Sequence, residues 1–497
     1  MGAETWPEDE SMPISPDSLR RGILWGATGQ AAARILGLVS LTVLARLIAP
    51  RDFGLLAIGT AVIAFATQIT EIGVASALVQ RQGEVRDNAS AAFYMNATVV
   101  VLCTVALVLL SGTIARFFDQ PLLAKLIPVL SASFLMRSSM YVHEAYLRKR
   151  MLFRRLHLIN IASAAIYGAV AIPLAASGAG VWSFAWGQLA ASGVYAGSVL
   201  AGSGMPLSIN PHLRQWRGLF VFGRWVFLGG IAAMILTNSD NVAVGKFLGP
   251  ASLGVYALAY NYGLFPFILI GGSIGQAAFP VYSRLQNDRG QLEHLLMKVV
   301  SMTAVVSLPI AGAMLFASND LLVALLGPKW TQAGPLFCVF GVVFTTLMFA
   351  ASFPRVYDAI DRPAVNLYIC VAALPVMALA LAVGLQFGLM GVALGISAMQ
   401  VFYAALAVFA VRKTVGISVR TIMGGVWPPA VCTGCGVAAG MLPFVLLRGL
   451  LPSLALDAIA CLAMLGVYVF SLRRFFPPLW LEALSQGQAV FSARSRG

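Results

Sequence analysis

Apolar segments of about 20 residues follow one another along most of the chain, separated by short polar connections. A helix needs about 20 apolar residues to cross about 30 Å of hydrocarbon, so each segment is expected to span a membrane. Fourteen segments fit this length, namely residues 22–46, 53–80, 90–115, 121–142, 155–176, 180–203, 219–246, 252–282, 292–317, 331–354, 363–385, 388–411, 420–447 and 453–472. The pattern predicts an all-α polytopic membrane protein with fourteen transmembrane helices.

The composition excludes a soluble globular protein. Hydrophobic residues make up 59% of the 497 residues and charged residues only 10%, and the mean hydropathy is +0.85. Six cysteines all fall within predicted spans, where they form no disulfide framework. Neither a metal site nor a catalytic set of residues is expected.

Lys and Arg fall mainly on every second connection, and the connection at 148–155 is the most basic. The opposite side of the membrane receives only Arg46, Arg51, Arg116, Lys125, Lys246, Lys329 and Arg448. Because cytoplasmic connections carry the excess of Lys and Arg, both termini are expected in the cytoplasm. The net charge of +14 therefore follows from topology and requires no nucleic-acid partner.

An internal duplication organises the chain. A shift of 200 residues aligns ARLIAPRDFGLLAI at 45–58 with GKFLGPASLGVYAL at 245–258. Six spans per copy is an even number, so both copies cross the membrane in the same sense, as two bundles related by a pseudo-twofold axis along the membrane normal. The copies are predicted at 20–205 and 206–413. Residues 414–475 are expected to form the last two helices. Residues 1–19 are expected to form a disordered cytoplasmic tail, and residues 476–497 a second cytoplasmic tail.

Arg34 lies in the middle of the first apolar segment. At about 1.5 Å per residue it is about 20 Å from Arg21 and from Arg46, too deep for its side chain to reach water along the helix. An arginine at this depth costs at least about 2.5 kcal/mol unless it faces a wet cavity, a partner or an anionic ligand. Gln30 precedes it by one turn, so one face of this helix is polar and is expected to line a substrate cavity.

The second span carries a polar stripe at helical spacing, formed by Thr60, Thr67 and Glu71. Glu71 lies at a depth similar to that of Arg34. An ion pair between them that only fastens two helices is the structural alternative to a binding role for Arg34.

Arg137 is a second deep cation, eleven residues before Arg148, and Tyr141 and Glu144 follow it on the same helix face. Two permanent cations predict an anion with more than one charge, because the planar guanidinium matches phosphate oxygens.

The second copy carries Asp240 and Asn241 at membrane depth. Asp240 and Glu71 are candidates for coupling to a cation gradient, and a structural hydrogen-bonding role remains open for Asp240. No cofactor is expected, and a proton or sodium gradient is left open as the energy source.

The chain contains the motifs RILGL at 34–38, ARLIAPRDFGL at 45–55, IGVASALVQR at 72–81, RKRMLFRR at 148–155 and LLGPKW at 325–330. Together these motifs resemble the Wzx-type polysaccharide transporter flippases of the MOP superfamily. The resemblance covers residues 20–475 and implies a MATE-like fold in the bacterial inner membrane. The implied activity is the transfer of undecaprenyl-diphosphate-linked oligosaccharide to the periplasmic leaflet for exopolysaccharide or O-antigen export. Membrane lipids and a polysaccharide polymerase or co-polymerase are the other implied partners.

Arg34 matches the cavity arginine of the related lipid II flippases, but Ser40 and Leu41 stand where that family has Arg followed by Asp. The rest of the lipid II site is therefore not carried over. Two other classes remain as alternatives. A MATE-like drug antiporter would need an acidic pocket for cations, and a membrane glycosyltransferase or polysaccharide polymerase would need acidic groups in a sizeable periplasmic loop.

Overall fold

The apolar segments fold into long helices. The computed structural model of the protein describes residues 16–70, 85–150, 152–205, 213–285, 288–316, 320–350, 352–360, 362, 364–447 and 451–485. Within these ranges, 10 helical segments are long and apolar enough to cross a membrane. The prediction of an all-helical polytopic membrane protein is confirmed.

The helices follow in chain order with short connections. The first seven described helices are α1 (Pro16–Leu47), α2 (Pro50–Thr70), α4 (Val85–Phe117), α5 (Leu123–Ser138), α6 (Tyr141–Lys149), α7 (Phe153–Ala176) and α8 (Val181–Ser203). The rest are α9 (Leu213–Phe247), α10 (Gly249–Arg284), α11 (Arg289–Met314), α12 (Asp320–Leu326), η1 (Pro328–Trp330), α13 (Ala333–Ala350), α14 (Pro354–Ala359), α15 (Ala364–Gly384), η2 (Leu385–Phe387), α16 (Gly388–Thr414), α17 (Val419–Leu446) and α18 (Ser453–Phe475). Residues 477–485 form a further short helix after α18.

Two boundaries differ in detail from the sequence expectation. The predicted span at 121–142 is divided into α5 and α6 by a turn at Ser139 and Met140, where the Met140 amide donates to the Arg137 carbonyl at 3.2 Å. Helix α1 begins at Pro16, inside the segment expected to be a disordered tail.

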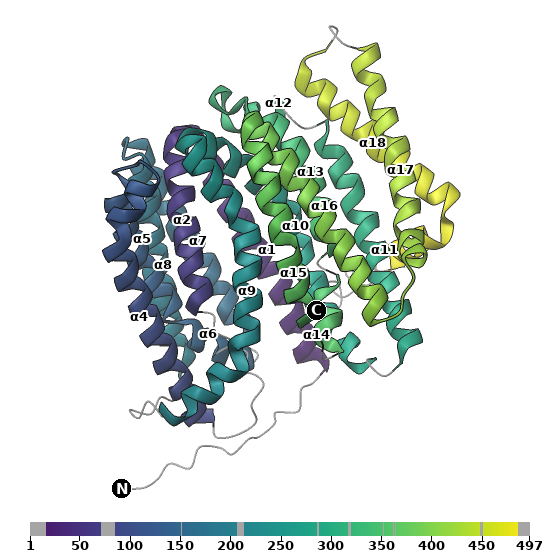
Figure 1. The fold of residues 1–497 in the computed structure, drawn as a ribbon. Helices are drawn as coiled ribbons and strands as arrows, with labels where there is room; N and C mark the ends of the chain where they lie inside the picture. Colours follow the sequence, from purple (N-terminus) through teal and green to yellow (C-terminus); the bar gives the residue numbers. More distant parts are fainter. Residues whose placement is uncertain are drawn as a thin grey trace.

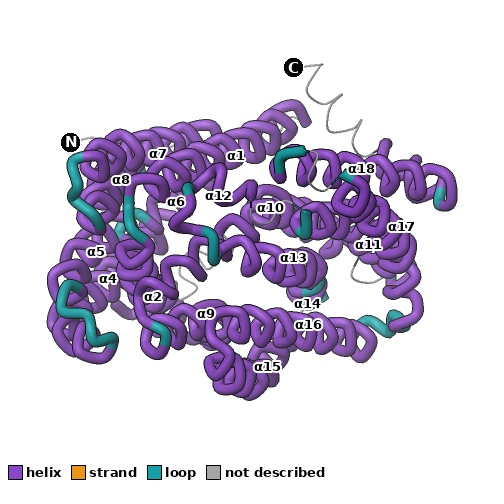
Figure 2. Tube along the Cα trace, turned by 90° about the horizontal axis from the view of Figure 1, so that it is seen from above, coloured by secondary structure: helices purple, strands orange, loops and turns teal. Residues whose placement is uncertain are grey.

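The helices run roughly side by side through the molecule (Figure 1). Viewed along the bundle, α4, α5 and α8 lie on one side and α11 and α13 on the other (Figure 2). Helix α2 packs against both α10 and α9, and so connects the first half of the chain to the second. Helices α17 and α18 pack on each other beside α11 at the outer edge.

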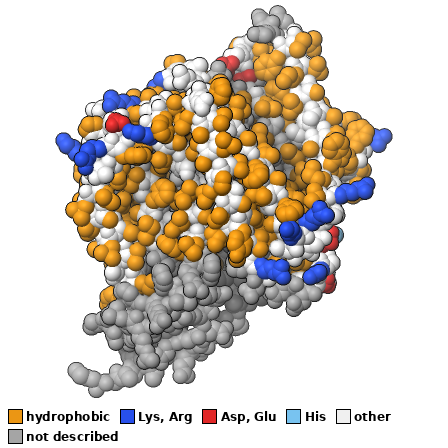
Figure 3. All heavy atoms as spheres, in the orientation of Figure 1, with side chains coloured by type: hydrophobic (Ala, Val, Ile, Leu, Met, Phe, Trp, Pro, Cys, Tyr) orange, Lys and Arg blue, Asp and Glu red, His pale blue; other side chains and the backbone are white. Residues whose placement is uncertain are grey.

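Hydrophobic side chains cover much of the described outer face, and Lys and Arg gather near its rims (Figure 3). Leu109 is 77% exposed and Val445 is 78% exposed. A soluble protein rarely exposes a continuous apolar surface of this extent, whereas lipid chains would cover it. The exposed apolar residues are therefore the lipid-facing surface of the spans.

One end of the bundle is closed by close helix contact. At this end α1 turns into α2 and α9 turns into α10. A Cβ atom on Gly54 would overlap the Pro250 carbonyl, and one on Gly254 would overlap the Pro50 carbonyl. Only glycine permits such an approach of two backbones. We call this region, with the neighbouring residues 324–330, the closed end.

Side chains from 324–330 reinforce the closed end by capping α1. The Lys329 ammonium donates to the Ile48 carbonyl at 2.7 Å and to the Arg46 carbonyl at 3.0 Å, and the Trp330 indole donates to the Ala45 carbonyl at 2.9 Å. The Arg46 guanidinium in turn donates to the Leu325 carbonyl at 2.7 Å, near the end of α12. The last carbonyls of a helix lack partners within it, so each segment satisfies the other's free carbonyls.

Candidate functional site

A polar cavity of about 440 Å³ lies among α2, α5, α6 and α8. Its described walls are formed by Thr60, Ile63, Thr67, Leu130, Ser133, Phe134, Arg137, Ser138, Tyr141, Glu144, Arg148 and Gln188. Thr60 and Thr67 belong to the polar stripe predicted on the second span, and Arg137 is one of the two predicted deep cations. The cavity is therefore the place where the predicted polar faces of α2 and α5 meet.

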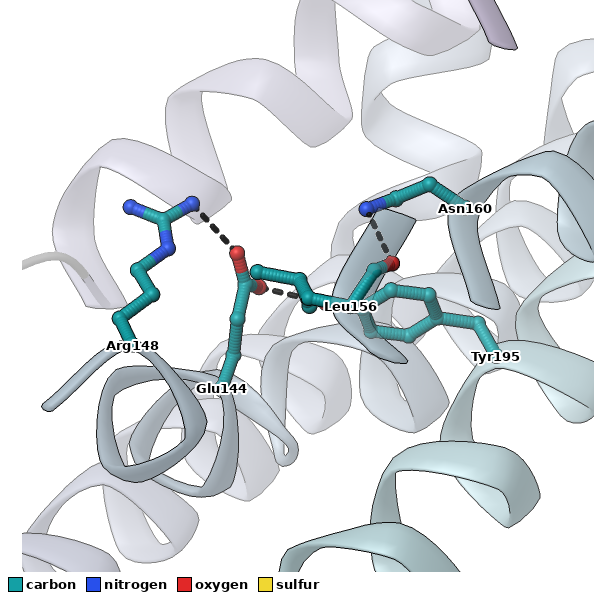
Figure 4. Close-up of polar contacts among 5 residues, drawn as sticks. All are labelled: Glu144, Arg148, Leu156, Asn160 and Tyr195. Atoms are coloured by element: carbon teal, nitrogen blue, oxygen red, sulfur yellow. Dashed lines mark hydrogen bonds and ion pairs between the residues drawn. The ribbon is translucent and has the colours of Figure 1, made fainter. Parts of the chain in front are cut away.

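The charged groups of the cavity form a connected set. The Glu144 carboxylate accepts from the Arg148 guanidinium through Oε1 at 2.5 Å and from the Tyr195 hydroxyl through Oε2 at 2.5 Å (Figure 4). The Arg137 guanidinium carbon lies 4.1 Å from the centre of the Tyr195 ring, a cation–π contact. Tyr195 thus touches the carboxylate with its hydroxyl and Arg137 with its ring.

The local fold explains how this set is assembled. The turn after α5 lets α6 start in a new direction, which brings Glu144 and Arg148, one helical turn apart, to the same cavity as Arg137. Helix α8 packs on both α5 and α6 and supplies Tyr195. The resulting site contains two guanidinium groups and one carboxylate, so its charged groups carry a net positive charge.

Arg34 and Gln30 are not among the described residues that line this cavity. Both are exposed, and within the described part of the chain the Arg34 guanidinium makes no ion pair or hydrogen bond. Arg34 shares a face of α1 with Leu38, Leu41 and Ala45, at helical spacings of four, seven and eleven residues. Leu38 and Leu41 pack on the core and Ala45 is buried at the closed end. The same helix face is therefore buried near the closed end and accessible at Arg34.

Asp240 lies on α9, is not among the described residues that line the cavity, and is 2% exposed. Its Oδ2 accepts from the Tyr256 hydroxyl at 2.7 Å and its Oδ1 accepts from the Asn241 backbone amide at 2.8 Å. No Lys or Arg of the described ranges pairs with it. The other coupling candidate, Glu71, lies outside the described residues.

Sequence reasoning missed Gln188 and Tyr195, and it noted Glu144 only as a neighbour of Arg137. Gln188, Ser192 and Tyr195 stand at i, i+4 and i+7 on α8, the spacing of one helix face. This polar stripe could have been read from the sequence. Its contact with Arg137 and Glu144 depends on how α8 packs, which the spacing does not give.

Known proteins resemble the chain in sequence. It is 27% identical over 434 residues to the lipopolysaccharide biosynthesis protein WzxC of Escherichia coli strain K12, covering 83% of this chain and 85% of that protein. It is 25% identical over 329 residues to the succinoglycan biosynthesis transport protein ExoT of Rhizobium meliloti, covering 65% of each chain. The resemblance to Wzx-type flippases is therefore confirmed.

The fold also matches a solved structure. The lipid II flippase MurJ, in an inward closed conformation, superposes with a TM-score of 0.73 over 91% of this chain and 99% of that chain, at 17% sequence identity. At this identity the match establishes the fold. Together with a relative described as a transport protein, it confirms the expectation of a transporter over an enzyme.

A family model described as polysaccharide biosynthesis protein matches residues 43–335, more than half of the chain. The match includes the closed end and every described wall of the cavity. With its bacterial relatives and its apolar helices, the chain is a multi-pass protein of a bacterial inner membrane. It belongs to the polysaccharide biosynthesis protein family.

Proposed function

We propose that this protein is a flippase that moves an oligosaccharide linked to undecaprenyl diphosphate from the cytoplasmic to the periplasmic leaflet. The transported unit would serve polysaccharide export, such as that of an exopolysaccharide or O-antigen. The relatives named for lipopolysaccharide and succinoglycan biosynthesis support this substrate class. A polysaccharide polymerase or co-polymerase would receive the unit after transfer.

The observation that carries the proposal is the pair of arginines in the cavity. Arg137 and Arg148 line one polar space inside the helix bundle, together with hydroxyl groups such as that of Thr60. A guanidinium donates two parallel hydrogen bonds to phosphate oxygens, and such charge-assisted bonds are about twice as strong as neutral ones. Hydroxyl and amide groups around the arginines suit the first sugar attached to a diphosphate.

The environment of Glu144 distinguishes a flippase of anionic lipids from the alternative function, a drug/cation antiporter. A carboxylate in a cavity would attract a cationic drug, but this one is paired with Arg148 at 2.5 Å. With Arg137 counted as well, cations outnumber carboxylates among the described walls. An anionic headgroup therefore fits the cavity better than a cationic drug does.

We further propose that fourteen helices form two six-helix bundles, over 20–205 and 206–413, with two additional helices at 414–475. The reciprocal approach of Gly54 to Pro250 and Gly254 to Pro50 supports this arrangement, since a twofold axis pairs each residue with its counterpart. Rocking of the bundles about the closed end would open the cavity region to alternate sides. Arg34, on the accessible part of α1, would meet the diphosphate along this path.

The orientation is proposed from the distribution of Lys and Arg, with the closed end periplasmic and both termini cytoplasmic. Single cysteines placed in 148–155 and near Arg494 should be protected from an impermeant reagent in intact cells. Cysteines near Asp52 and Lys329 should react. Labelling of 148–155 without permeabilisation would overturn the orientation.

Asp240 is the proposed site of coupling to a proton or sodium gradient, with Glu71 as the other candidate. A carboxylate held by Tyr256 inside the membrane, with no cationic partner in the described ranges, can change its charge only by taking up a proton or another cation. Asp240→Asn and Glu71→Gln should reduce the dependence of export on the gradient. Unchanged dependence in both variants would make the two carboxylates structural.

Deletion of the gene tests the function directly. The expected result is loss of the polysaccharide and accumulation of a lipid-linked oligosaccharide accessible from the cytoplasmic leaflet, with both effects reversed by the wild-type gene. Accumulation of the oligosaccharide at the periplasmic leaflet would instead place the defect after transfer and contradict a flippase.

A further inference from the structure

We propose that Glu144 is an internal counter-ion which the substrate's diphosphate displaces from Arg148. The inference rests on the proposed function and assigns a specificity-determining role to a residue of the same cavity. In the empty cavity Glu144 neutralises Arg148. When the diphosphate binds, Arg148 exchanges the carboxylate for phosphate oxygens, and Arg137 contacts the same anion.

The exposure of the two partners supports an exchangeable pair. The Arg148 side chain is 61% exposed and the Glu144 side chain is 19% exposed. The guanidinium is therefore accessible to a ligand while it is bonded to the carboxylate. Pairs of neighbouring charges at i and i+4 on an accessible helix face are weak and shift an equilibrium by only about twofold, so a ligand with more charge can compete.

The carboxylate keeps a partner when Arg148 leaves. Its second oxygen, Oε2, accepts from the Tyr195 hydroxyl at 2.5 Å, and this bond does not involve Arg148. A half-buried carboxylate with no partner would be strongly unfavourable, which would hold the ion pair together. Tyr195 removes that barrier by holding Glu144 against α8.

Tyr195 also positions the second cation. The guanidinium carbon of Arg137 lies 4.1 Å from the centre of the Tyr195 ring. A cation held over an aromatic ring face forms no hydrogen bond with it, so the N–H groups of Arg137 stay available to an anion. Arg137 makes no ion pair with a carboxylate of the described ranges. One guanidinium is thus open to an anion from the start, and the second becomes open when Glu144 is displaced.

The exchange makes Glu144 a competitor of the ligand. Removing its charge while keeping its shape should therefore strengthen anion binding. A structural role, in which Glu144 only fastens α6 to α8, predicts the reverse, because loss of the ion pair would loosen Arg148 and weaken binding. The two roles differ in the sign of the effect.

The test measures binding of farnesyl diphosphate to the purified full-length protein in lipid nanodiscs, with farnesol as the probe without phosphate. Glu144→Gln should bind farnesyl diphosphate about twofold more tightly than the wild type, because it removes a competing pair of about that strength. The glutamine still accepts from Tyr195. Glu144→Ala serves the same purpose if glutamine impairs folding, which size-exclusion chromatography would detect.

Two further variants isolate the exchange. Arg148→Ala should bind about tenfold more weakly than the wild type, and adding Glu144→Gln to it should give no gain, because the competitor then has nothing to release. Tyr195→Phe keeps the ring that faces Arg137 but removes the hydroxyl that holds Glu144 after Arg148 leaves, so it should bind the diphosphate about threefold more weakly than the wild type. Unchanged binding in this variant would overturn the role of the hydroxyl in the exchange.

The outcomes separate this inference from the proposed function. Failure of the wild type to bind farnesyl diphosphate in preference to farnesol would overturn both. Binding that needs Arg148 but is unchanged or weakened in Glu144→Gln would overturn the exchange alone and leave the cavity as the anion site. The exchange would also be overturned if the Glu144→Gln/Arg148→Ala double variant bound farnesyl diphosphate more tightly than Arg148→Ala does.

Discussion

Two regions of the molecule use basic side chains in different ways. At the closed end, Arg46 and Lys329 donate to backbone carbonyls of neighbouring segments. In the cavity, Arg148 contacts a side-chain carboxylate and Arg137 contacts an aromatic ring. A backbone carbonyl cannot leave without moving its helix, whereas a side chain can change rotamer or be replaced by a ligand. The partner of a basic side chain therefore distinguishes the cations fixed to the backbone at the closed end from the cavity cations that are proposed to bind the substrate.

The largest effect is expected from Gly54→Ala at the closed end. The added methyl group would overlap the Pro250 carbonyl, and neither backbone can move without separating α2 from α10. We expect a loss of about 3 kcal/mol of stability and loss of export. The measurement is thermal unfolding of the purified protein, together with export of the polysaccharide.

Gly37→Ala is the matched control for this prediction. Gly37 is also a helical glycine, on α1, and a Cβ there would meet nothing within 4 Å. Alanine should be neutral or slightly stabilising at this position, since it favours the helix. Equal stability of the Gly54 and Gly37 variants would mean that the closed end is not tightly packed.

In the cavity, substitution of Arg137 is expected to lower export without lowering the stability of the protein. Arg137→Ala removes the guanidinium that faces Tyr195. Loss of a charge-assisted contact of about 3 kcal/mol should lower export by on the order of a hundredfold at normal protein level. Arg137→Lys should retain only part of the export activity, because an ammonium lacks the planar fork of a guanidinium. Arg116→Ala, at an exposed position near the end of α4, is the control and should export normally. Normal export by a stable Arg137→Ala protein would exclude the cavity as the substrate site.

Substitution of Arg34 is expected to give a similar but smaller loss of export, on the order of tenfold, because Arg34 is proposed to meet the diphosphate on its way to the cavity and is not one of the cavity's described walls. Arg34→Lys should insert normally and lose part of this function, and Arg34→Ala should lose more. Polysaccharide export is compared in Arg34→Ala, Glu71→Ala and the double variant. Recovery of export in the double variant would identify an ion pair that fastens two helices, since removing both charges leaves no unpaired one.

The smallest effect is expected from Trp330→Phe. The smaller ring fills only part of the buried space, and the Ala45 carbonyl loses the indole N–H that bonds it at 2.9 Å. The expected loss of stability is about 1 kcal/mol. Lys329→Ala, which removes donors to two carbonyls, should give a larger shift and should raise the reactivity of a cysteine introduced near Asp52. Unchanged reactivity in both variants would show that these bonds do not hold the end closed.

The pattern of apolar segments was sufficient to predict a polytopic helical protein, because the length and hydrophobicity of a span are local properties. It was also sufficient to identify Arg34 and Arg137 as unusual, since depth along a helix follows from counting residues. The division of the span at 121–142 was not predicted. Apolar and polar residues continue at helical spacing through Ser139 and Met140, whereas the packing of α6 against α4, α7 and α8 is a tertiary feature that this spacing does not give.

The sequence by itself determined the membrane setting and the helical class, and it predicted a duplication around Gly54 and Gly254 and arginines at membrane depth. The tertiary structure decided what those residues contact. It set Arg46 against carbonyls and Arg148 against Glu144, and it brought Tyr195 from α8 to Arg137 of α5. The physical reason is that depth and periodicity depend on neighbours along the chain, whereas the partner of a charge depends on which helix faces pack together, and spacing along one helix does not specify the face that meets it.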